Sequence, residues 1–187
     1  MPERSYLDWN ATAPLRDEAR AALSEAFALA GNPSSVHAEG RAARRVVEQA
    51  REEVAALVGA EPANVFFTSG GTEANMLALT PAIETATEKL PRDRLFISAI
   101  EHPSVRTGGR FAAGAIEEVP VTADGRLDLA VLADAVGKAS RPLLSLMLAN
   151  NETGVVQPVA AAAAIVHAAG GLIHVDAVQG PGRIACD

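Results

Sequence analysis

Cysteine is almost missing from this sequence, and aromatic residues are scarce. Cys186 is the single cysteine, so no disulfide can form within the chain, which agrees with a reducing compartment. Aromatic residues make up 4% of the sequence, whereas Ala, Val and Leu supply most of its apolar content. This mixture favours helices packed closely on a sheet over a β-sandwich.

Long apolar runs and an excess of basic residues are also missing. Gly, Pro or a charged residue interrupts each apolar run before it reaches the length of a membrane span. The N-terminal residues 1–5 lack the apolar core of a signal peptide. The 23 acidic and 16 basic residues give a net charge of −7, which argues against a nucleic-acid partner. We therefore expect a soluble cytoplasmic protein that binds neither nucleic acid nor membranes, and we predict no metal site.

What the sequence does contain is enough apolar material for a sizeable core. Of the 187 residues, 49% are hydrophobic and 21% are charged, which is typical of a folded chain and not of a disordered one. The length suits one domain, or one domain and part of a second. Two helices are predicted before residue 64, one from Thr12 to Ala30 and one from Val36 to Val58, the second with a single buried apolar stripe.

From residue 64 onwards, short β-rich runs alternate with helical segments. This alternation predicts βαβ units, and apolar runs of this kind are typical of strands covered on both sides. The fold class is therefore α/β, a mostly parallel sheet with helices on both faces. The predicted strands are 65–68, 95–100, 116–121, 143–149 and 172–175, with a further possible strand at 183–186, and the predicted helices are 73–89, 103–113, 128–138 and 158–169.

Polar clusters follow four of the predicted strands. The carboxyl ends of parallel strands share one edge of a sheet, where ligands bind, so we expect these clusters to converge. They are Ser69-Gly70-Gly71-Thr72-Glu73, Glu101-His102, Asn150-Asn151-Glu152, and Asp176 with Gln179.

The first two clusters suggest a phosphate site and a proton-transfer group. Gly71 and Thr72 lie at a strand-to-helix junction, where backbone N–H groups, a hydroxyl and the helix dipole favour a phosphate. An ordinary turn capped by Thr72 is the alternative. His102 could stack on a flat ring and exchange protons, although a lone histidine is more often a surface or capping residue. His37 is the second candidate of this kind, whereas His167 and His174 look structural.

The other two clusters suggest contacts to a pyridine ring. Neutral donors such as Asn151 can bind a phenolate oxygen, and the alternative is a turn or a cap. A carboxylate such as Asp176 can keep a pyridine nitrogen protonated, which makes the ring an electron sink; the alternative is a solvated helix cap. Together the four clusters outline a site for pyridoxal phosphate.

These residues resemble the N-terminal half of the cysteine desulfurases, which belong to the class V aminotransferase-like, fold type I enzymes that use pyridoxal phosphate. The resemblance spans nearly the whole chain in the order of the family's motifs. The matching stretches are Tyr-Leu-Asp-Trp-Asn-Ala-Thr (6–12), Gly-Asn-Pro-Ser-Ser-Val-His (31–37), Phe-Thr-Ser-Gly-Gly-Thr-Glu-Ala-Asn (67–75), Glu-His-Pro-Ser-Val (101–105), Asn-Asn-Glu-Thr-Gly-Val-Val-Gln-Pro (150–158) and His-Val-Asp-Ala-Val-Gln (174–179).

The resemblance implies a role for each matching residue. Gly71 and Thr72 would bind the phosphate, and His102 would stack on the ring as an acid and base. Asp176 would contact the pyridine nitrogen.

Further contacts are implied to the phenolic oxygen side of the ring and to the substrate. Asn151 and Gln179 would contact its phenolic oxygen, while Asn10, Asn32 and Ser34 would lie close to the substrate. The implied reaction removes sulfur from L-cysteine and gives alanine and an enzyme persulfide. The implied partners are a second copy of the chain and a sulfur-acceptor protein, in iron–sulfur cluster assembly or in thiolation.

The sequence departs from the family pattern in one decisive respect. The family's Schiff-base lysine follows the Asp…Gln segment in a Ser-x-His-Lys context that these 187 residues do not contain, and the only lysines are Lys89 and Lys138. Neither follows a predicted strand, and Cys186 does not match the persulfide-forming cysteine. We therefore expect residues 1–12 to form an N-terminal segment and 13–187 an incomplete large domain of a fold type I transferase, without the rest of that domain or the small domain.

Two alternatives stay open. Another class V enzyme, a lyase or an aminotransferase, could share the same cofactor contacts. The chain could also be a non-catalytic fragment or a dimerisation module.

Overall fold

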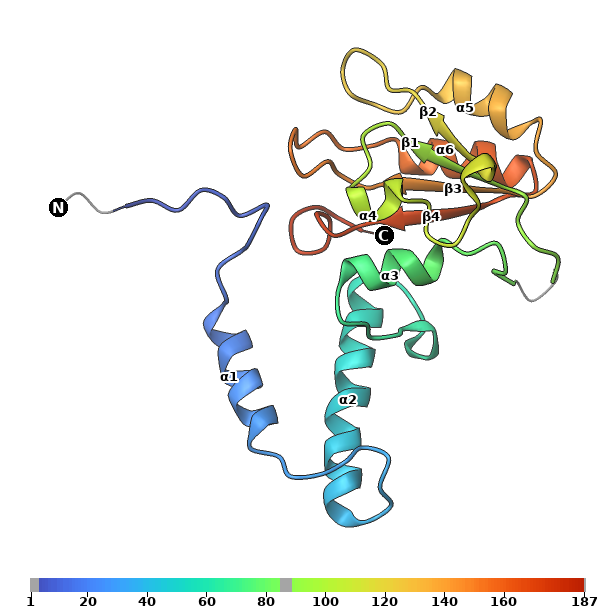
Figure 1. The fold of residues 1–187 in the computed structure, drawn as a ribbon. Helices are drawn as coiled ribbons and strands as arrows, with labels where there is room; N and C mark the ends of the chain where they lie inside the picture. Colours follow the sequence, from blue (N-terminus) through green and yellow to red (C-terminus); the bar gives the residue numbers. More distant parts are fainter. Residues whose placement is uncertain (1–3, 85–88, 187) are drawn as a thin grey trace. The chain divides into compact units, whose positions relative to one another are not determined.

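The computed structural model describes residues 4–84 and 89–186 (Figure 1). These residues form two compact units, one made of residues 4–67 with 184–186 and the other of residues 68–183. The predicted boundary between an N-terminal segment, residues 1–12, and the large domain stays a prediction.

The first unit contains the two helices predicted before residue 64. They are α1 (Asp17–Phe27) and α2 (Ala38–Leu57), followed by the short 3₁₀ helix η1 (Pro62–Asn64). Both α-helices are shorter than predicted. α2 begins after His37, because the Nδ1 atom of this residue accepts a hydrogen bond of 3.4 Å from the N–H of Gly40.

The buried stripe predicted on α2 is largely wrong. Ala55 is 1% exposed, but Val46, Val54 and Leu57 are 42%, 39% and 59% exposed. Val47 and Ala50 of the predicted stripe are half-buried. Burial of an apolar face also needs a neighbouring element that covers it.

The second unit is built on four parallel strands, which confirms the predicted α/β class. The strands lie in the order β2-β1-β3-β4 and all neighbours are parallel (Figure 1). Their bounds are β1 (Arg94–Ser98), β2 (Ile116–Val119), β3 (Pro142–Met147) and β4 (Leu172–Asp176).

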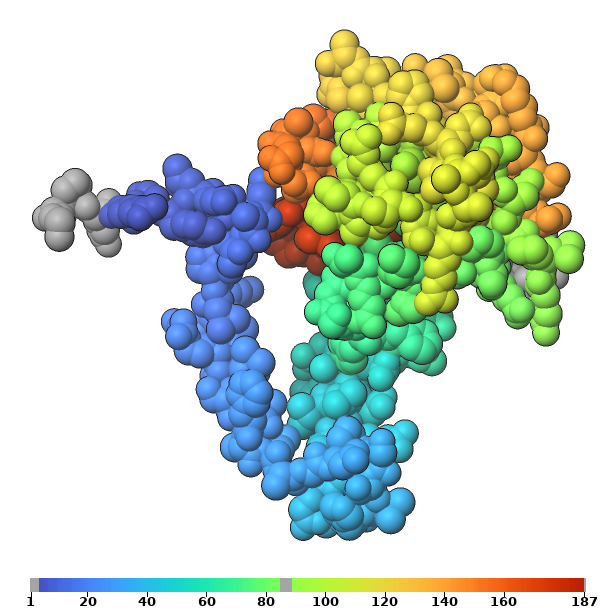
Figure 2. Space-filling view, in the orientation of Figure 1, coloured from blue at the N-terminus to red at the C-terminus, as the bar shows by residue number. Residues whose placement is uncertain are grey.

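Helices cover both faces of this sheet. They are α3 (Gly71–Ala78), α4 (Pro103–Arg106), α5 (Leu129–Val136) and α6 (Val159–Ala168), with the 3₁₀ helix η2 (Ala113–Ala115) before β2. Leu95 packs with Val105 of α4 on one face, while its neighbour Phe96 packs with Leu132 of α5 and Val166 of α6 on the other. Successive strand residues thus enter different cores, and Figure 2 shows the second unit, coloured green to red, as closely packed.

Two predicted strands are wrong, and two predicted helices are too long. Residues 65–68 and 183–186 are not strands. Phe66 and Phe67 are 80% and 52% exposed, so the run 65–68 is apolar without being buried. The predicted helix 103–113 is the single turn α4, and the predicted helix 73–89 ends as α3 at Ala78, with residues 85–88 lying outside the described ranges.

The chain changes direction in the sheet between β1 and β3. After β1 the chain adds β2 on one side, and it then returns to place β3 and β4 on the other side. In parallel α/β sheets, ligands bind at the carboxyl ends of the strands where the order reverses in this way. The fold therefore places the candidate site beyond Ser98 and Met147.

Candidate active site

The carboxyl ends of β1, β3 and β4 bring the predicted polar residues of the second unit to one edge of the sheet. Glu101 and His102 follow β1, Asn150 and Asn151 follow β3, and Asp176 ends β4. Asn75 and Ser104 link two of these side chains, those of His102 and Asp176, by hydrogen bonds.

Asp176 is buried and held from two sides. It is 9% exposed. Its Oδ2 atom accepts a hydrogen bond of 2.9 Å from Nδ2 of Asn75 on α3, and its Oδ1 atom accepts one of 3.1 Å from the N–H of Val178. The carboxylate is therefore fixed between the end of β4 and the helix that begins at the predicted phosphate turn.

His102 is joined to the same network. Nδ2 of Asn75 also donates to Oγ of Ser104 at 2.9 Å, and this oxygen lies 2.7 Å from Nδ1 of His102. The N–H of Ser104 donates to Nδ1 at 3.2 Å, so that His102 caps the N-terminus of α4. The structure thus brings together His102 and Asp176, two of the predicted residues, through two residues whose roles were not predicted.

Glu101 ties β1 to β3 where the strand order reverses. It is 4% exposed, and its Oε1 atom accepts hydrogen bonds from Oγ of Ser98 at 2.6 Å and from the N–H of Met147 at 2.8 Å. Its Oε2 atom is buried without a partner among the described residues. Burial raises the pKa of Glu101 to about 7, the negative charge of Asp176 adds to this rise, and the two hydrogen bonds oppose it.

The turn after β3 is organised by Asn150. Its Oδ1 atom accepts from the N–H groups of Glu152 and Thr153, both at 2.9 Å, and its Nδ2 atom donates to the carbonyl of Ile100 at 3.1 Å. The neighbouring Asn151 donates from Nδ2 to Oε1 of Glu152 at 2.6 Å. Asn151 therefore lies in a turn that Asn150 stabilises. Its contact with a phenolic oxygen stays a prediction.

The predicted phosphate turn begins α3. Gly71 and Thr72 are exposed in the first turn of this helix, whose first N–H groups have no acceptor within the helix. A Cβ atom on Gly71 would lie 3.1 Å from Cγ2 of Val178, so a larger residue would crowd the segment after β4. The N–H of Ser69 donates to Oε2 of Glu73 at 2.7 Å, and this backbone hydrogen bond lowers the pKa of Glu73. The remaining N–H groups can bind an anion.

Three predicted substrate residues, Asn10, Asn32 and Ser34, belong to the first unit. Asp176 belongs to the second unit. Oδ1 of Asn32 accepts from the N–H of Ser34 at 2.9 Å, which orders the loop before α2. Their predicted proximity to the substrate stays a prediction, as does the ring contact of Gln179, whose side-chain oxygen accepts a hydrogen bond from Arg183.

Asn75, Ser104 and Glu101 are the functional candidates that sequence reasoning did not assign. Asn75 and Ser104 stood inside the motifs that carried the resemblance, without a role of their own. Asn75 lies three positions after Thr72 and is 4% exposed. A buried polar residue on a short helix needs a polar partner. The sequence alone does not show that this face of the helix is buried, so it could not single out Asn75.

Neither lysine is near this edge. Lys138 follows α5 and precedes β3, and its exposed Nζ atom lies 2.5 Å from Oδ2 of Asp134. This ion pair raises the pKa of Lys138. Lys89 is exposed and precedes β1. Because a residue before a strand lies near its amino end, both lysines belong to the opposite edge of the sheet.

The other three histidines differ in their surroundings. Nδ1 of His174 lies 2.9 Å from Oγ of Ser145 across β4 and β3, and burial lowers the pKa of His174, opposed by the charge of Asp176. His167 is exposed on α6, and His37 caps α2. Cys186 is half-buried, and its Sγ atom donates to the carbonyl of Ile184 at 3.4 Å.

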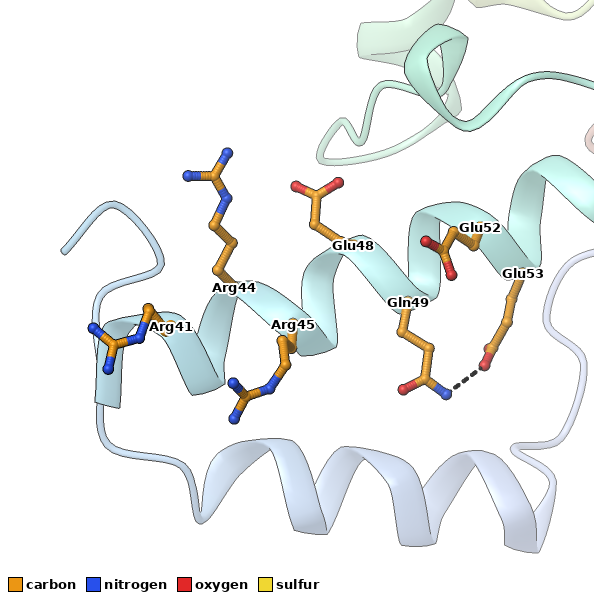
Figure 3. A pocket seen from close by; sticks show the side chains of 7 residues that line it. All are labelled: Arg41, Arg44, Arg45, Glu48, Gln49, Glu52 and Glu53. Atoms are coloured by element: carbon orange, nitrogen blue, oxygen red, sulfur yellow. Dashed lines mark hydrogen bonds between the residues drawn. The ribbon is translucent and has the colours of Figure 1, made fainter. Parts of the chain in front are cut away.

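A hollow is present on α2 in the first unit. Figure 3 shows its lining side chains, which all belong to this one helix and are charged or amide groups: Arg41, Arg44, Arg45, Glu48, Gln49, Glu52 and Glu53. Nε2 of Gln49 donates to Oε1 of Glu53 at 2.9 Å. Such side chains are typical of a solvated helix surface.

The described residues contain neither a candidate metal site nor a candidate membrane-spanning helix. Across residues 4–84 and 89–186, no group of three or more His, Cys, Asp or Glu side chains could hold a metal ion. None of the helices in the described part of the chain is both long and apolar enough to cross a membrane.

The sequence is similar to two kinds of curated relative. A cysteine desulfurase of Cereibacter sphaeroides is 42% identical over 97% of this chain and 48% of the relative. A selenocysteine lyase of Xenopus tropicalis is 37% identical over 100% of this chain and 49% of the relative. The chain thus spans about half the length of the curated relatives it matches.

Solved structures and a family model agree with these relatives. A NifS-like protein from Rickettsia africae ESF-5 superimposes with a TM-score of 0.86 at 32% identity, over 97% of this chain and 50% of that one. The model of the family described as aminotransferase class-V matches residues 5–187. Because this match covers almost the whole sequence, the chain belongs to the class V aminotransferase family.

Proposed function

We propose that this chain forms the cofactor-binding part of a pyridoxal phosphate-dependent cysteine desulfurase, which removes sulfur from L-cysteine and gives alanine and an enzyme persulfide. The observation that carries the proposal is the buried carboxylate of Asp176. It lies at the end of β4 and is tied through Asn75 to the helix that starts with the anion-binding turn. Similarity to cysteine desulfurases supports the choice of substrate.

The donors and acceptors at this edge fit pyridoxal phosphate. The first turn of α3 offers free N–H groups and the hydroxyl of Thr72 to a phosphate, aided by the helix dipole. Asp176 offers a fixed negative charge to a protonated ring nitrogen. When bound, the cofactor supplies an electron-poor ring that stabilises negative charge on a substrate carbon.

The remaining residues act around the ring. His102 would lie over it and hold or release a proton at Nε2, because Nδ1 is engaged by Ser104. Asn151 and Gln179 would donate to the phenolic oxygen. Asn10, Asn32 and Ser34 would contact the substrate.

Complete turnover requires groups that these 187 residues do not place at the site. Lys89 and Lys138 belong to the other edge of the sheet, so neither can hold the cofactor covalently. We therefore expect cofactor binding through noncovalent contacts, and no release of sulfur from cysteine by this polypeptide alone. A homodimer and a sulfur-acceptor protein are the partners proposed for the active enzyme, which we assign to the cytoplasm.

Replacing Asp176 tests the proposal. Pyridoxal phosphate is titrated into the 187-residue chain and into Asp176→Ala, and binding is followed by the absorbance of the cofactor. We expect Asp176→Ala to bind at least tenfold more weakly, about 1.4 kcal/mol, because the ring nitrogen loses its counter-charge. Asp134→Ala, which changes an exposed carboxylate on α5, serves as the control and should bind like the unchanged chain. Equal affinities for Asp176→Ala and the control would show that the wrong carboxylate is assigned.

A second candidate is a lyase that acts on selenocysteine. The 37% identity to the Xenopus tropicalis enzyme favours it, because both reactions would use the same ring contacts. Comparing kcat/KM for L-cysteine and L-selenocysteine in a completed enzyme separates the two. A clear preference for L-selenocysteine would replace the first proposal.

A further inference from the structure

We infer that Asn75 and Ser104 are positioning residues that join Asp176 to His102 in one chain of hydrogen bonds and hold His102 in the tautomer with its proton on Nε2. The chemical roles of His102 and Asp176 rest on the proposed function. The hydrogen-bond chain itself rests on the geometry alone.

At the Asp176 end of the hydrogen-bond chain, it is clear which group donates and which accepts. An ionised carboxylate only accepts hydrogen bonds, so Asn75 must turn its amide nitrogen and not its oxygen towards Asp176. The two hydrogens on Nδ2 then serve the two neighbours observed, Oδ2 of Asp176 and Oγ of Ser104, both at 2.9 Å. Ser104 therefore receives a hydrogen bond from Asn75.

The direction is also fixed at the His102 end. A backbone N–H can only donate, and that of Ser104 is directed at Nδ1 of His102 at 3.2 Å. Nδ1 must therefore be unprotonated and accept. Because Oγ of Ser104 already accepts from Asn75, its own hydrogen is free to donate to Nδ1 at 2.7 Å. The neutral ring then carries its proton on Nε2.

Burial makes this arrangement costly to change. Asn75 and Asp176 are 4% and 9% exposed, and a buried polar group without a partner is destabilising. The members come from α3, the start of α4 and the end of β4. Displacement of any one of these elements would break a bond in the chain.

The hydrogen-bond chain gives the two ring nitrogens of His102 different roles. Nδ1 of His102 serves the protein, which leaves Nε2 as the atom that can exchange a proton with a bound molecule. A shift in the position of Asp176 would be passed through Asn75 and Ser104 to the imidazole ring.

Nitrogen NMR of the histidine rings tests the inference on the unliganded 187-residue chain. The spectrum is recorded at alkaline pH, where imidazoles are neutral, and His102→Gln identifies the His102 signals. We expect the Nε2–H tautomer in the unchanged chain. Ser104→Ala removes one of the two donors to Nδ1, so signals of the Nδ1–H tautomer should appear. Ser104→Thr keeps the hydroxyl and should retain the original pattern.

The variant Asn75→Ala tests whether Asn75 acts on His102 through Ser104. On its own it should move the His102 signals in the same direction as Ser104→Ala, and added to Ser104→Ala it should cause no further change. Unchanged His102 signals in Ser104→Ala, or full additivity of the two variants, would overturn the inference. Should Asn75→Ala fail to fold, the comparison of Ser104→Ala with Ser104→Thr decides alone, because Ser104 is only half-buried. Failure to bind pyridoxal phosphate would count against the proposed function and leave this result standing.

Discussion

At the scale of single residues, Glu101 shows how burial changes the chemistry of a carboxyl group. One of its oxygens accepts hydrogen bonds from β1 and β3, while the other has no partner among the described residues. The neutral form is therefore favoured in the folded chain. Its pKa of about 7 lies above the ordinary value of 4.5.

This difference makes stability depend on pH. Between pH 4.5 and about 7 the folded chain binds more protons at Glu101 than the unfolded chain, so its contribution to stability is complete below 4.5 and falls as the pH rises towards 7. The loss is roughly 3 kcal/mol. We expect Glu101→Gln, which cannot ionise, to lack this decrease in urea unfolding measured at several pH values.

Glu117→Gln provides the matched control, because Glu117 is exposed on β2. The control should retain the pH dependence of the unchanged chain. If Glu101→Gln and Glu117→Gln show the same pH dependence, Glu101 is ionised in the folded chain and its assignment as a buried neutral group is wrong.

The positions of the candidate residues in the fold could be predicted at this scale, but their contacts could not. His102 and Asp176 were placed correctly at strand ends because a polar residue after an apolar run is visible in the sequence. The bond between Asn75 and Asp176 spans 101 positions. It depends on how α3 packs against β4, and no local pattern contains that information.

At the scale of elements, α5 illustrates how a helix start is set by one side chain. Oδ1 of Asp128 accepts hydrogen bonds from the N–H groups of Ala130 and Val131 at 3.0 and 3.1 Å. These are donors that the helix itself cannot satisfy. The cap explains why α5 begins at Leu129.

Removing this cap should destabilise the second unit. We expect Asp128→Ala to lower the free energy of unfolding by about 1 kcal/mol, measured by urea unfolding at constant pH. Asp128→Ser keeps a side-chain acceptor and should lose much less. Equal losses in the two variants would mean that the capping bonds do not contribute.

The elements that were predicted correctly share a physical property. The strands β1 and β3 are apolar and buried on both faces, so composition and environment agree. The run 65–68 is also largely apolar, but it pairs with no strand among the described residues, and Phe66 and Phe67 are exposed. Sequence patterns report which residues favour a strand, whereas pairing and burial depend on the rest of the fold.

At the scale of the whole molecule, the two units differ in how much core they contain. The fully buried large side chains lie in the second unit, for example Leu95 and Leu144 at 0% exposure and Phe96 at 1%. In the described part of the first unit, Ala55 is the only buried hydrophobic side chain, and α1 has no buried residue.

Hydrogen exchange should therefore differ between the units. We expect the amides of β1 and β3 to exchange at least about a hundredfold more slowly than those of α1, because few buried contacts oppose local opening of α1. Mass spectrometry of peptides covering 17–27, 94–98 and 142–147 measures this. Exchange of all three peptides at one common rate would show that the chain unfolds as a single cooperative unit.

The position of β4 has one more consequence. Within the described ranges β4 pairs with β3 alone, so the backbone N–H and C=O groups along its outer side remain available to another strand. A strand that docked there in parallel would have its carboxyl end next to Asp176, at the edge of the sheet that carries the proposed site.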